Sequence, residues 1–150
     1  MKTFPDKIPI FPLSGVIYFP KTNLPLNIFE ERYLDLVNDA VRKDKLIGMI
    51  QSSGKGNEVY KVGCLGKIND YQKSKDGRVL ISLTGLTRFE TLEEVNNSKL
   101  YREFKVIYDK FKFDLKPASE DVDIKMLMDQ AKIFLEKTKV LFLYISLFFL

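Results

Sequence analysis

Residues 59–95 read VYKVGCLGKINDYQKSKDGRVLISLTGLTRFETLEEV, and this stretch decides the fold. Asp76 and Gly77 stand between two runs of strand-forming residues, and Asp-Gly is a preferred pair for the two-residue turn of a β-hairpin. After the turn, apolar and more polar side chains alternate over residues 79–84. Because successive side chains of a strand point to opposite faces, the alternation predicts one core face, made of Val79, Ile81 and Leu83.

Three glycines interrupt the two runs, at positions 63, 66 and 85. Glycine weakens the interior of an ordinary strand and often marks a bulge or a tight bend. Gly63 and Gly66 therefore indicate a sheet that curls into a barrel, and we expect Gly85 to break its strand. Residues 86–95 and 100–111 then predict two further strands, joined by a polar turn.

Upstream of this stretch, two apolar runs open the chain, residues 8–13 and 16–19. They predict two short strands or an extended arm. Pro9 and Pro12 cannot donate a backbone hydrogen bond, so we expect the first run at a sheet edge or in an irregular segment. Residues 46–50 predict a buried strand, and a polar, glycine-rich loop follows it.

Two amphipathic helices are predicted. From Pro25 onwards, apolar positions recur every three or four residues while charged residues take the other face. This first stripe consists of Phe29, Tyr33, Leu36, Val37, Ala40 and Val41. A second helix is expected to open at Pro117 and Ser119, with acidic residues in its first turn and a stripe from Ile124 to Leu135. The elements together predict an α+β fold that is mostly β.

The composition of the 150 residues is that of a globular chain, with 45% hydrophobic and 29% charged residues. No histidine and one cysteine, Cys64, exclude Ser-His-Asp and Cys-His catalysis, His-based metal sites and a disulfide within the chain. We therefore expect no cofactor and no metal site, and Cys64 fits a small buried side chain in a strand. The net charge of +4 is too small to demand a nucleic-acid partner.

The two ends of the chain carry expectations about its location. Pro5, Asp6 and Pro9 interrupt the first ten residues, so no export signal is expected, and a reducing cytoplasm is the simplest location. Residues 140–150 read VLFLYISLFFL, which falls short of the roughly 20 apolar residues of a bilayer span. We expect this tail to extend the second helix or fold back on it, and to cause either self-association or a stickiness due to missing downstream sequence. If the tail is such a remnant, deleting residues 140–150 should improve solubility and yield a monomer.

Three local motifs have simple structural interpretations. The sequence GMIQSSGKG, residues 48–56, has the wrong spacing for a phosphate-binding loop and lacks its Ser/Thr. Basic and aromatic residues are interleaved in residues 101–112, but alternation divides them between two faces, which favours an ordinary amphipathic strand over a nucleic-acid surface. We expect Phe89 to pack inside the barrel and Arg88 to bind carbonyls or a carboxylate near the sheet edge.

Several linked motifs resemble those of one known family. Residues 8–41 contain Pro-Leu, Phe-Pro and PLNIFEERY in this order, and YKVGCLGKI, residues 60–68, and LTGLTRFETLEEV, residues 83–95, follow at familiar spacing. Together they resemble the Lon N-terminal domain family, and the stand-alone Lon-domain proteins in particular. The resemblance implies a PUA-like β pseudo-barrel with one helix inserted after the second strand and a helical C-terminal segment. It assigns residues 1–115 to the barrel and 116–150 to the helical segment, which we expect to be truncated relative to the family.

The resemblance also implies a function. It suggests a non-catalytic polypeptide-binding module for unfolded or tagged protein clients, working with a protease or chaperone, because the sequence lacks the Walker A and Ser-Lys protease segments of full Lon. Phe29 and Tyr33 are the candidate polypeptide-binding residues, although both also fit the core face of the first helix. Since PUA-like barrels also serve as RNA modules, RNA binding is the alternative function.

Overall fold

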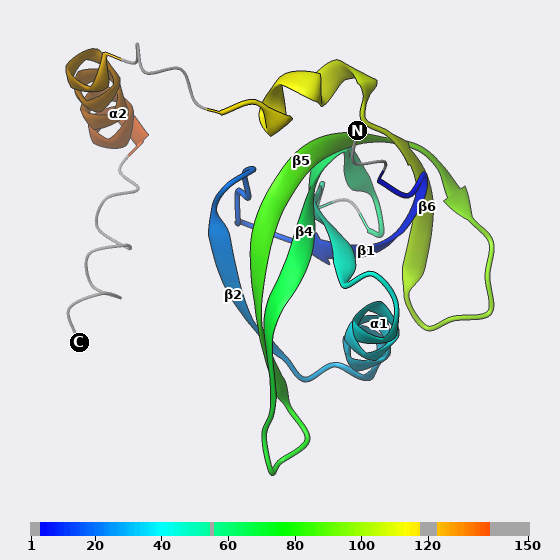
Figure 1. Ribbon diagram of the computed structural model, residues 1–150. Helices are drawn as coiled ribbons and strands as arrows, with labels where there is room; N and C mark the ends of the chain where they lie inside the picture. Colours follow the sequence, from blue (N-terminus) through cyan, green and yellow to red (C-terminus); the bar gives the residue numbers. More distant parts are fainter. Residues whose placement is uncertain (1–3, 55, 118–122, 139–150) are drawn as a thin grey trace. The chain divides into compact units, whose positions relative to one another are not determined.

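The computed structural model describes residues 4–54, 56–117 and 123–138, and of residues 134–138 only the backbone. The chain divides into two compact units, Met1–Lys116 and Pro117–Leu150. The first unit contains six strands, one α-helix and one 3-10 helix (Figure 1). Their bounds are β1 Lys7–Leu13, β2 Asn23–Ile28, α1 Glu31–Arg42, β3 Leu46–Ser52, β4 Val59–Lys73, β5 Val79–Val95, β6 Arg102–Ile107 and η1 Asp109–Leu115.

The six strands form one sheet that closes on itself. Their order is β2-β5-β4-β3-β1-β6, and the far end of β5 also pairs with β6. All pairings are antiparallel except that of β1 with β3. The long strands β4 and β5 make this closure possible because register shifts after Leu65 and Ile68 bend their ladder. The architecture is the predicted mostly-β pseudo-barrel with one inserted helix.

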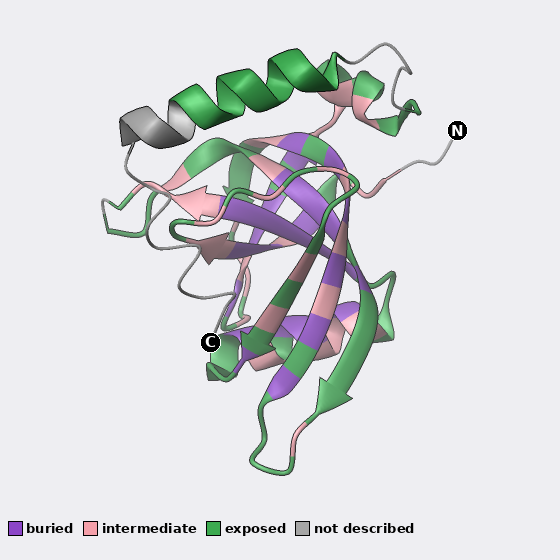
Figure 2. Cartoon of the chain, turned by 90° about the vertical axis from the view of Figure 1, so that its left-hand side faces the viewer, coloured by how far each residue is buried: buried purple, intermediate pink, exposed green. Residues whose placement is uncertain are grey.

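Two clusters of buried side chains fill the first unit. One lies under α1 and includes Leu36, Val37 and the predicted core face of β5. The other surrounds Phe89, which is fully buried as the sequence predicts, and includes Ile8 and Leu65. Buried and exposed residues alternate along the strands, as the sequence pattern requires (Figure 2).

The strands at the start of the chain differ from the prediction. β1 is not an edge strand, because it pairs with β6 through residues 7–10 and with β3 through residues 10–13. Pro9 and Pro12 each lie where β1 has a neighbour on one side only, so the missing N–H need not break a ladder. Residues 16–19 form no strand, which leaves the extended arm of the two predicted alternatives, and the second strand is β2, which pairs with residues 79–84.

The amphipathic helix α1 begins at Glu31, later than the change of period at Pro25 suggested. Pairing with β5 holds the preceding residues as a strand, although their apolar residues fit the helical stripe. Tyr33, Leu36, Val37 and Ala40 form the buried face of the helix, as predicted.

The hairpin turn has a different type from the expected one. The Ser74 amide donates to the Arg78 carbonyl oxygen at 2.8 Å, and the Gly77 amide donates to the Ser74 carbonyl oxygen at 3.1 Å. Gly77 has a φ of 90°, whereas Asp76 has no positive φ. This is a three-residue loop with glycine in the left-handed position, rather than the two-residue turn that Asp-Gly suggested. The hairpin extends away from the rest of the sheet in Figure 1.

Two predicted boundaries of the later strands are wrong. Gly85 does not break its strand, because β5 runs without interruption from Val79 to Val95. β6 ends at Ile107, and the chain then turns into η1 instead of continuing as a strand to residue 111. In η1, the Phe111 ring lies 4.7 Å from the Arg88 guanidinium, so this segment packs on the outward side of β5.

The second unit contains the helix α2, Ile124–Thr138. Pro117 is not helical, and the rest of the predicted opening, at Ser119, lies outside the described residues. The Asp123 carboxylate accepts a hydrogen bond from the Met126 amide at the first described turn. The described apolar side chains at the start of the predicted stripe, among them Leu127, are exposed. The expectations for the tail, residues 140–150, lie outside the described residues. Within the described part of the chain, no helix is both long and apolar enough to span a membrane.

Candidate functional site

A cavity of about 590 Å³ lies beside the segment that connects β1 to β2. We call residues 16–22 of this connection the arm and the cavity the arm groove. Its lining also includes the end of β3, residues 60–64 of β4, Leu13, Leu24 and Arg88. The volume is within the range of about 300–1,000 Å³ that is typical of ligand-binding pockets.

Backbone hydrogen bonds hold the arm against β5. The Lys21 amide donates to the Gly85 carbonyl oxygen at 2.8 Å, and the Gly85 amide donates to the Thr22 carbonyl oxygen at 2.9 Å. A Cβ atom at Gly85 would lie 2.1 Å from the Phe19 carbonyl oxygen, so the arm can approach β5 this closely only because residue 85 is glycine. At the other end, the Gln51 side chain donates to the Val16 carbonyl oxygen at 3.2 Å.

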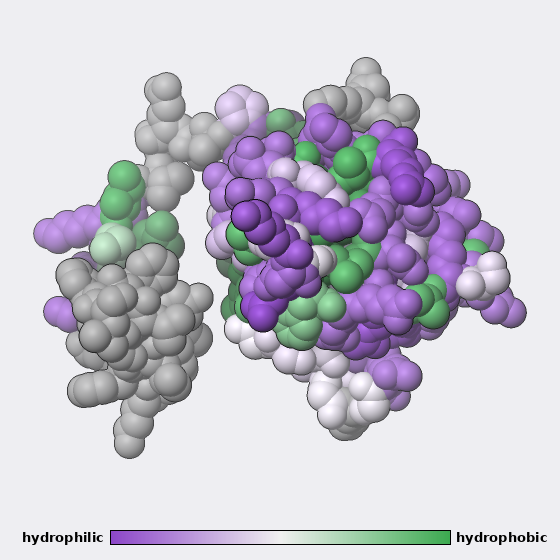
Figure 3. Space-filling model, turned by 90° about the horizontal axis from the view of Figure 1, so that it is seen from below, coloured by the Kyte–Doolittle hydropathy of each residue, from purple (hydrophilic) through white to green (hydrophobic). Residues whose placement is uncertain are grey.

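The walls of the arm groove are apolar and open to solvent. Ile17 and Phe19 of the arm have exposed fractions of 72% and 56%, and Tyr60 and Val62 of β4 are also exposed. Elsewhere the surface is mixed: on the face seen in Figure 3, hydrophobic residues form separate areas among hydrophilic ones. An apolar-lined cavity with exposed aromatic and aliphatic side chains is typical of an interaction site.

Two polar groups lie at the bottom of the groove, and neither suits catalysis. Burial raises the pKa of the Cys64 thiol to about 12, so the nucleophilic thiolate is scarce near neutral pH. Burial likewise raises the pKa of the Tyr18 hydroxyl far above its ordinary value. This hydroxyl lies over Gly66 and has no hydrogen-bond partner among the described residues.

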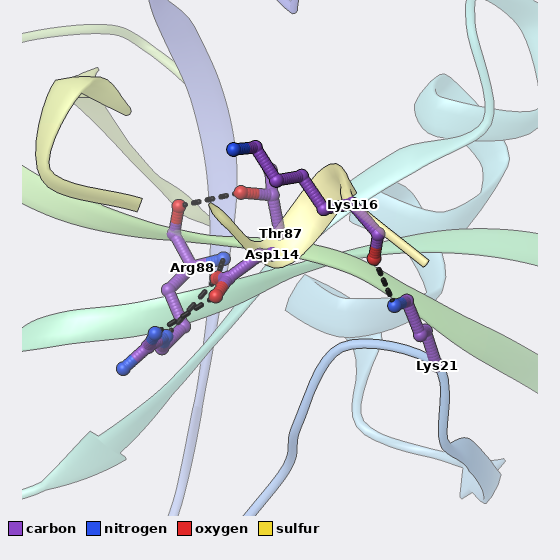
Figure 4. Close-up of polar contacts among 5 residues, drawn as sticks. All are labelled: Lys21, Thr87, Arg88, Asp114 and Lys116. Carbon is purple, nitrogen blue, oxygen red and sulfur yellow. Dashed lines mark hydrogen bonds and ion pairs between the residues drawn. The ribbon is translucent and has the colours of Figure 1, made fainter. Parts of the chain in front are cut away.

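The charged residues that line the groove are Lys61 and Arg88. Arg88 donates to both carboxylate oxygens of Asp114 in η1, at 3.0 and 2.8 Å, and its backbone amide donates to the same carboxylate at 2.9 Å (Figure 4). These bonds hold the pKa of Asp114 below its ordinary value and fix the guanidinium at the wall of the groove. The expected pairing of Arg88 with a carboxylate is confirmed.

The structure separates the two candidate binding residues that the sequence suggested. Tyr33 is buried, and its ring stacks on Phe11 with the ring centroids 4.1 Å apart. Phe29 precedes α1 and is 66% exposed, so the expectation that it fits the core face of the helix is wrong. Neither residue lines the arm groove.

The sequence reasoning missed the groove residues themselves. Residues 16–19 carry a clear apolar run, but the pattern leaves a short strand and an extended arm open and does not say whether the side chains are covered. The usable signal was the loop-forming Ser14-Gly15 before this run and Pro20 after it, which isolate it from the neighbouring strands.

No cluster of three or more potential metal ligands occurs among the described residues. The groove itself offers apolar surface, the cations Lys61 and Arg88, and the hydroxyl and thiol groups of Tyr18 and Cys64.

Comparisons with a family model, with known sequences and with solved structures all point to the same family. The sequence model of the ATP-dependent protease La (LON) substrate-binding domain matches residues 7–146. A Lon protease of Flavobacterium johnsoniae is 27% identical over 134 residues, which are 85% of this chain and 16% of that protein. The chain therefore spans only a small part of the length of this relative.

Two solved structures share the fold. The Lon N-terminal domain protein from Xanthomonas campestris matches with a TM-score of 0.60 and 27% identity, over 77% of this chain and 63% of that chain. The N-terminal domain of the Mycobacterium avium complex Lon protease matches with a TM-score of 0.59 over 91% of this chain and 72% of that chain. At 14% identity, the second likeness concerns the fold alone.

Proposed function

Because this chain belongs to the Lon substrate-binding domain family, we propose that it is a polypeptide-binding module that holds extended apolar segments of unfolded or tagged proteins in the arm groove. The observation that carries the proposal is the groove itself, with its exposed apolar walls. Folded proteins bury their apolar side chains, whereas unfolded chains present them. A groove of this kind therefore favours unfolded clients.

The physical basis of binding is the removal of apolar surface from water. Ile17 and Phe19 line the groove from the arm and Val62 lines it from β4, so a client side chain that enters the groove would bury apolar area on both partners. Such burial stabilises a complex by about 25 cal/mol per Å² before the cost of ordering the client. We expect micromolar affinity and broad sequence tolerance.

The module would act on clients through a partner that supplies the chemistry. The matching family domain is a substrate-binding domain, and the proposed partner is a protease or chaperone that receives the bound client. The free and buried Cys64 supports a reducing compartment such as the cytoplasm.

A titration with a permanently unfolded model polypeptide tests the proposal. We expect the double variant Ile17→Ser and Val62→Ser to bind at least about tenfold more weakly than the unchanged chain, because it loses apolar contacts on both walls. Leu80→Ser is the matched control, since Leu80 is exposed on β5 and does not line the groove. The proposal is wrong if the unchanged chain shows no binding at high micromolar concentration, or if the double variant binds as well as the control.

Phe29 is a second proposed contact, separate from the groove. Its exposed ring lies between β2 and α1, where an extended client could pass. If it contributes, Phe29→Ala weakens client binding about threefold to tenfold without changing the free energy of unfolding. Unchanged affinity would remove Phe29 from the binding surface.

A further inference from the structure

The charged residues found among the described lining of the arm groove are all cationic. Lys61 and Arg88 line it, and Lys21 belongs to the arm, whereas no carboxylate is found among the described lining residues. Asp114 balances Arg88 through two side-chain hydrogen bonds. Glu90 neighbours Val62 in the ladder but is paired with Lys110 at 2.6 Å. The mouth of the groove is therefore left with uncompensated positive charge.

Lys61 is the main source of this excess. Its ammonium group has no ion-pair or hydrogen-bond partner among the described residues, whereas several other lysines of the first unit pair with carboxylates. The Lys21 ammonium donates to the backbone carbonyl of Lys116, which satisfies a hydrogen bond but leaves the charge in place (Figure 4). Lys61, which lines the groove, is the cation available to an incoming carboxylate.

We propose that the arm groove prefers polypeptide segments in which an acidic residue, Asp or Glu, stands next to the apolar side chains. This inference rests on the proposed function and specifies its client class. The apolar walls bind the client side chain, and the carboxylate beside it meets Lys61 at the mouth. Segments flanked by lysine or arginine are disfavoured because they bring like charges close to Lys61.

The size of the preference follows from the exposure of the lysines. An exposed ion pair contributes little to affinity. Replacing a neutral flank with an acidic one should therefore tighten binding about threefold, and replacing a basic flank with an acidic one should tighten it about tenfold. The difference should shrink when the salt concentration rises from about 0.05 M to about 0.5 M, because the charges are screened. The apolar contribution should persist at high salt.

The preference is tested with three peptides. They share one core of Leu, Phe and Ser and differ only in their flanks, which are Glu, Gln or Lys. Binding to the full chain is followed by fluorescence anisotropy, and we expect affinities in the order Glu, Gln, Lys. In the Lys61→Glu variant, the ratio of affinities for the Glu and Lys peptides should fall at least about threefold. Lys73→Glu is the matched control, because Lys73 is also exposed on β4 but does not line the groove; it should leave the ratio almost unchanged.

The outcomes separate this inference from the function on which it rests. If the Gln peptide binds but the three affinities are equal, or if Lys73→Glu acts like Lys61→Glu, the charge preference is overturned and the binding module stands. If no peptide binds at high micromolar concentration, both are overturned. Tighter binding of a single-stranded RNA oligonucleotide than of the Glu peptide, with a steep loss in salt, would also overturn both and assign the cations to phosphate binding.

Discussion

The Phe89 ring is fully buried, and two glycines make room for it. A Cβ atom at Gly63 would lie 2.5 Å from the tip of the ring, and one at Gly48 would lie 3.1 Å from it. Larger residues at either position would have to push the ring away. Other neighbours also leave no room for a side chain, because a Cβ atom at Gly63 would lie 2.5 Å from the Met49 carbonyl oxygen and one at Gly48 would lie 2.6 Å from the Ile10 side chain.

Replacing this ring tests its role in the core. We expect Phe89→Ala to lower the free energy of unfolding by about 3–5 kcal/mol, because the ring is removed from a cluster that cannot fully collapse. Leu92→Ala is the control, since Leu92 is on the same strand and 59% exposed. Denaturant unfolding of both variants measures the effect. Equal stability of the two variants would contradict the assignment of Phe89 to the core.

At the scale of elements, the arm depends on its contact with β5. The absence of a side chain at Gly85 lets the arm backbone come close enough for two hydrogen bonds. Because the arm forms one wall of the groove, a change on β5 should reach the binding site through it.

Gly85→Ala tests this connection. The added methyl group should displace Phe19, lower the free energy of unfolding by about 1–3 kcal/mol, and weaken binding of the unfolded polypeptide. Ser82→Ala, on the same strand, should leave polypeptide affinity unchanged. Denaturant unfolding and the polypeptide titration provide the two measurements. Full affinity in the Gly85→Ala variant would show that the groove does not need the arm in this position.

The contact of η1 with β5 depends on the Arg88–Asp114 pair. Hydrogen bonds from Arg88 lower the pKa of Asp114 below its ordinary value of 3.8. Since the pKa is lower in the folded state than in the unfolded state, the pair stabilises the fold above about pH 4, and this stabilisation is lost as the pH falls through the folded pKa.

Asp114→Asn should therefore cost about 1–2 kcal/mol of unfolding free energy near pH 7, and much less near pH 2. Urea unfolding at both pH values measures the difference. Asp109→Asn is the control in the same segment, because Asp109 and its partner Lys112 are both well exposed. A deficit of the same size at both pH values would contradict the role of the Asp114 carboxylate.

At the scale of the whole molecule, both buried clusters lie within the first unit. We expect residues 1–116 alone to unfold cooperatively, with a midpoint within about 5 °C of that of the full chain, because the described core is retained. Thermal unfolding followed by circular dichroism measures this. Loss of the cooperative transition would show that residues 117–150 are part of the folding unit, against the domain boundary that we propose near residue 116.

Local sequence patterns predicted which side chains of the main strands and of α1 lie in the core. Alternation placed Val79, Ile81 and Leu83 in the core, and the helical stripe placed Leu36 and Val37 there, since side-chain direction follows directly from backbone period. Gly63 and Gly66, together with the family motifs, indicated the closed sheet, which alternation alone does not specify.

Contacts between segments far apart in the chain decided the strand pairings and boundaries that the sequence did not predict, and they also decided where the arm groove lies. Whether residues 16–19 form a strand depends on finding a partner strand, and the place beside residues 79–84 is taken by β2. Gly85 stays within β5 because it pairs with Gly66 of β4, and the arm backbone occupies the space that a side chain at residue 85 would need. Phe29 is exposed because β2 continues to Ile28 and delays the helix. The sequence by itself determined which faces of the elements are apolar; the tertiary structure decided which of those faces remain uncovered, because covering requires segments far apart in the chain to meet.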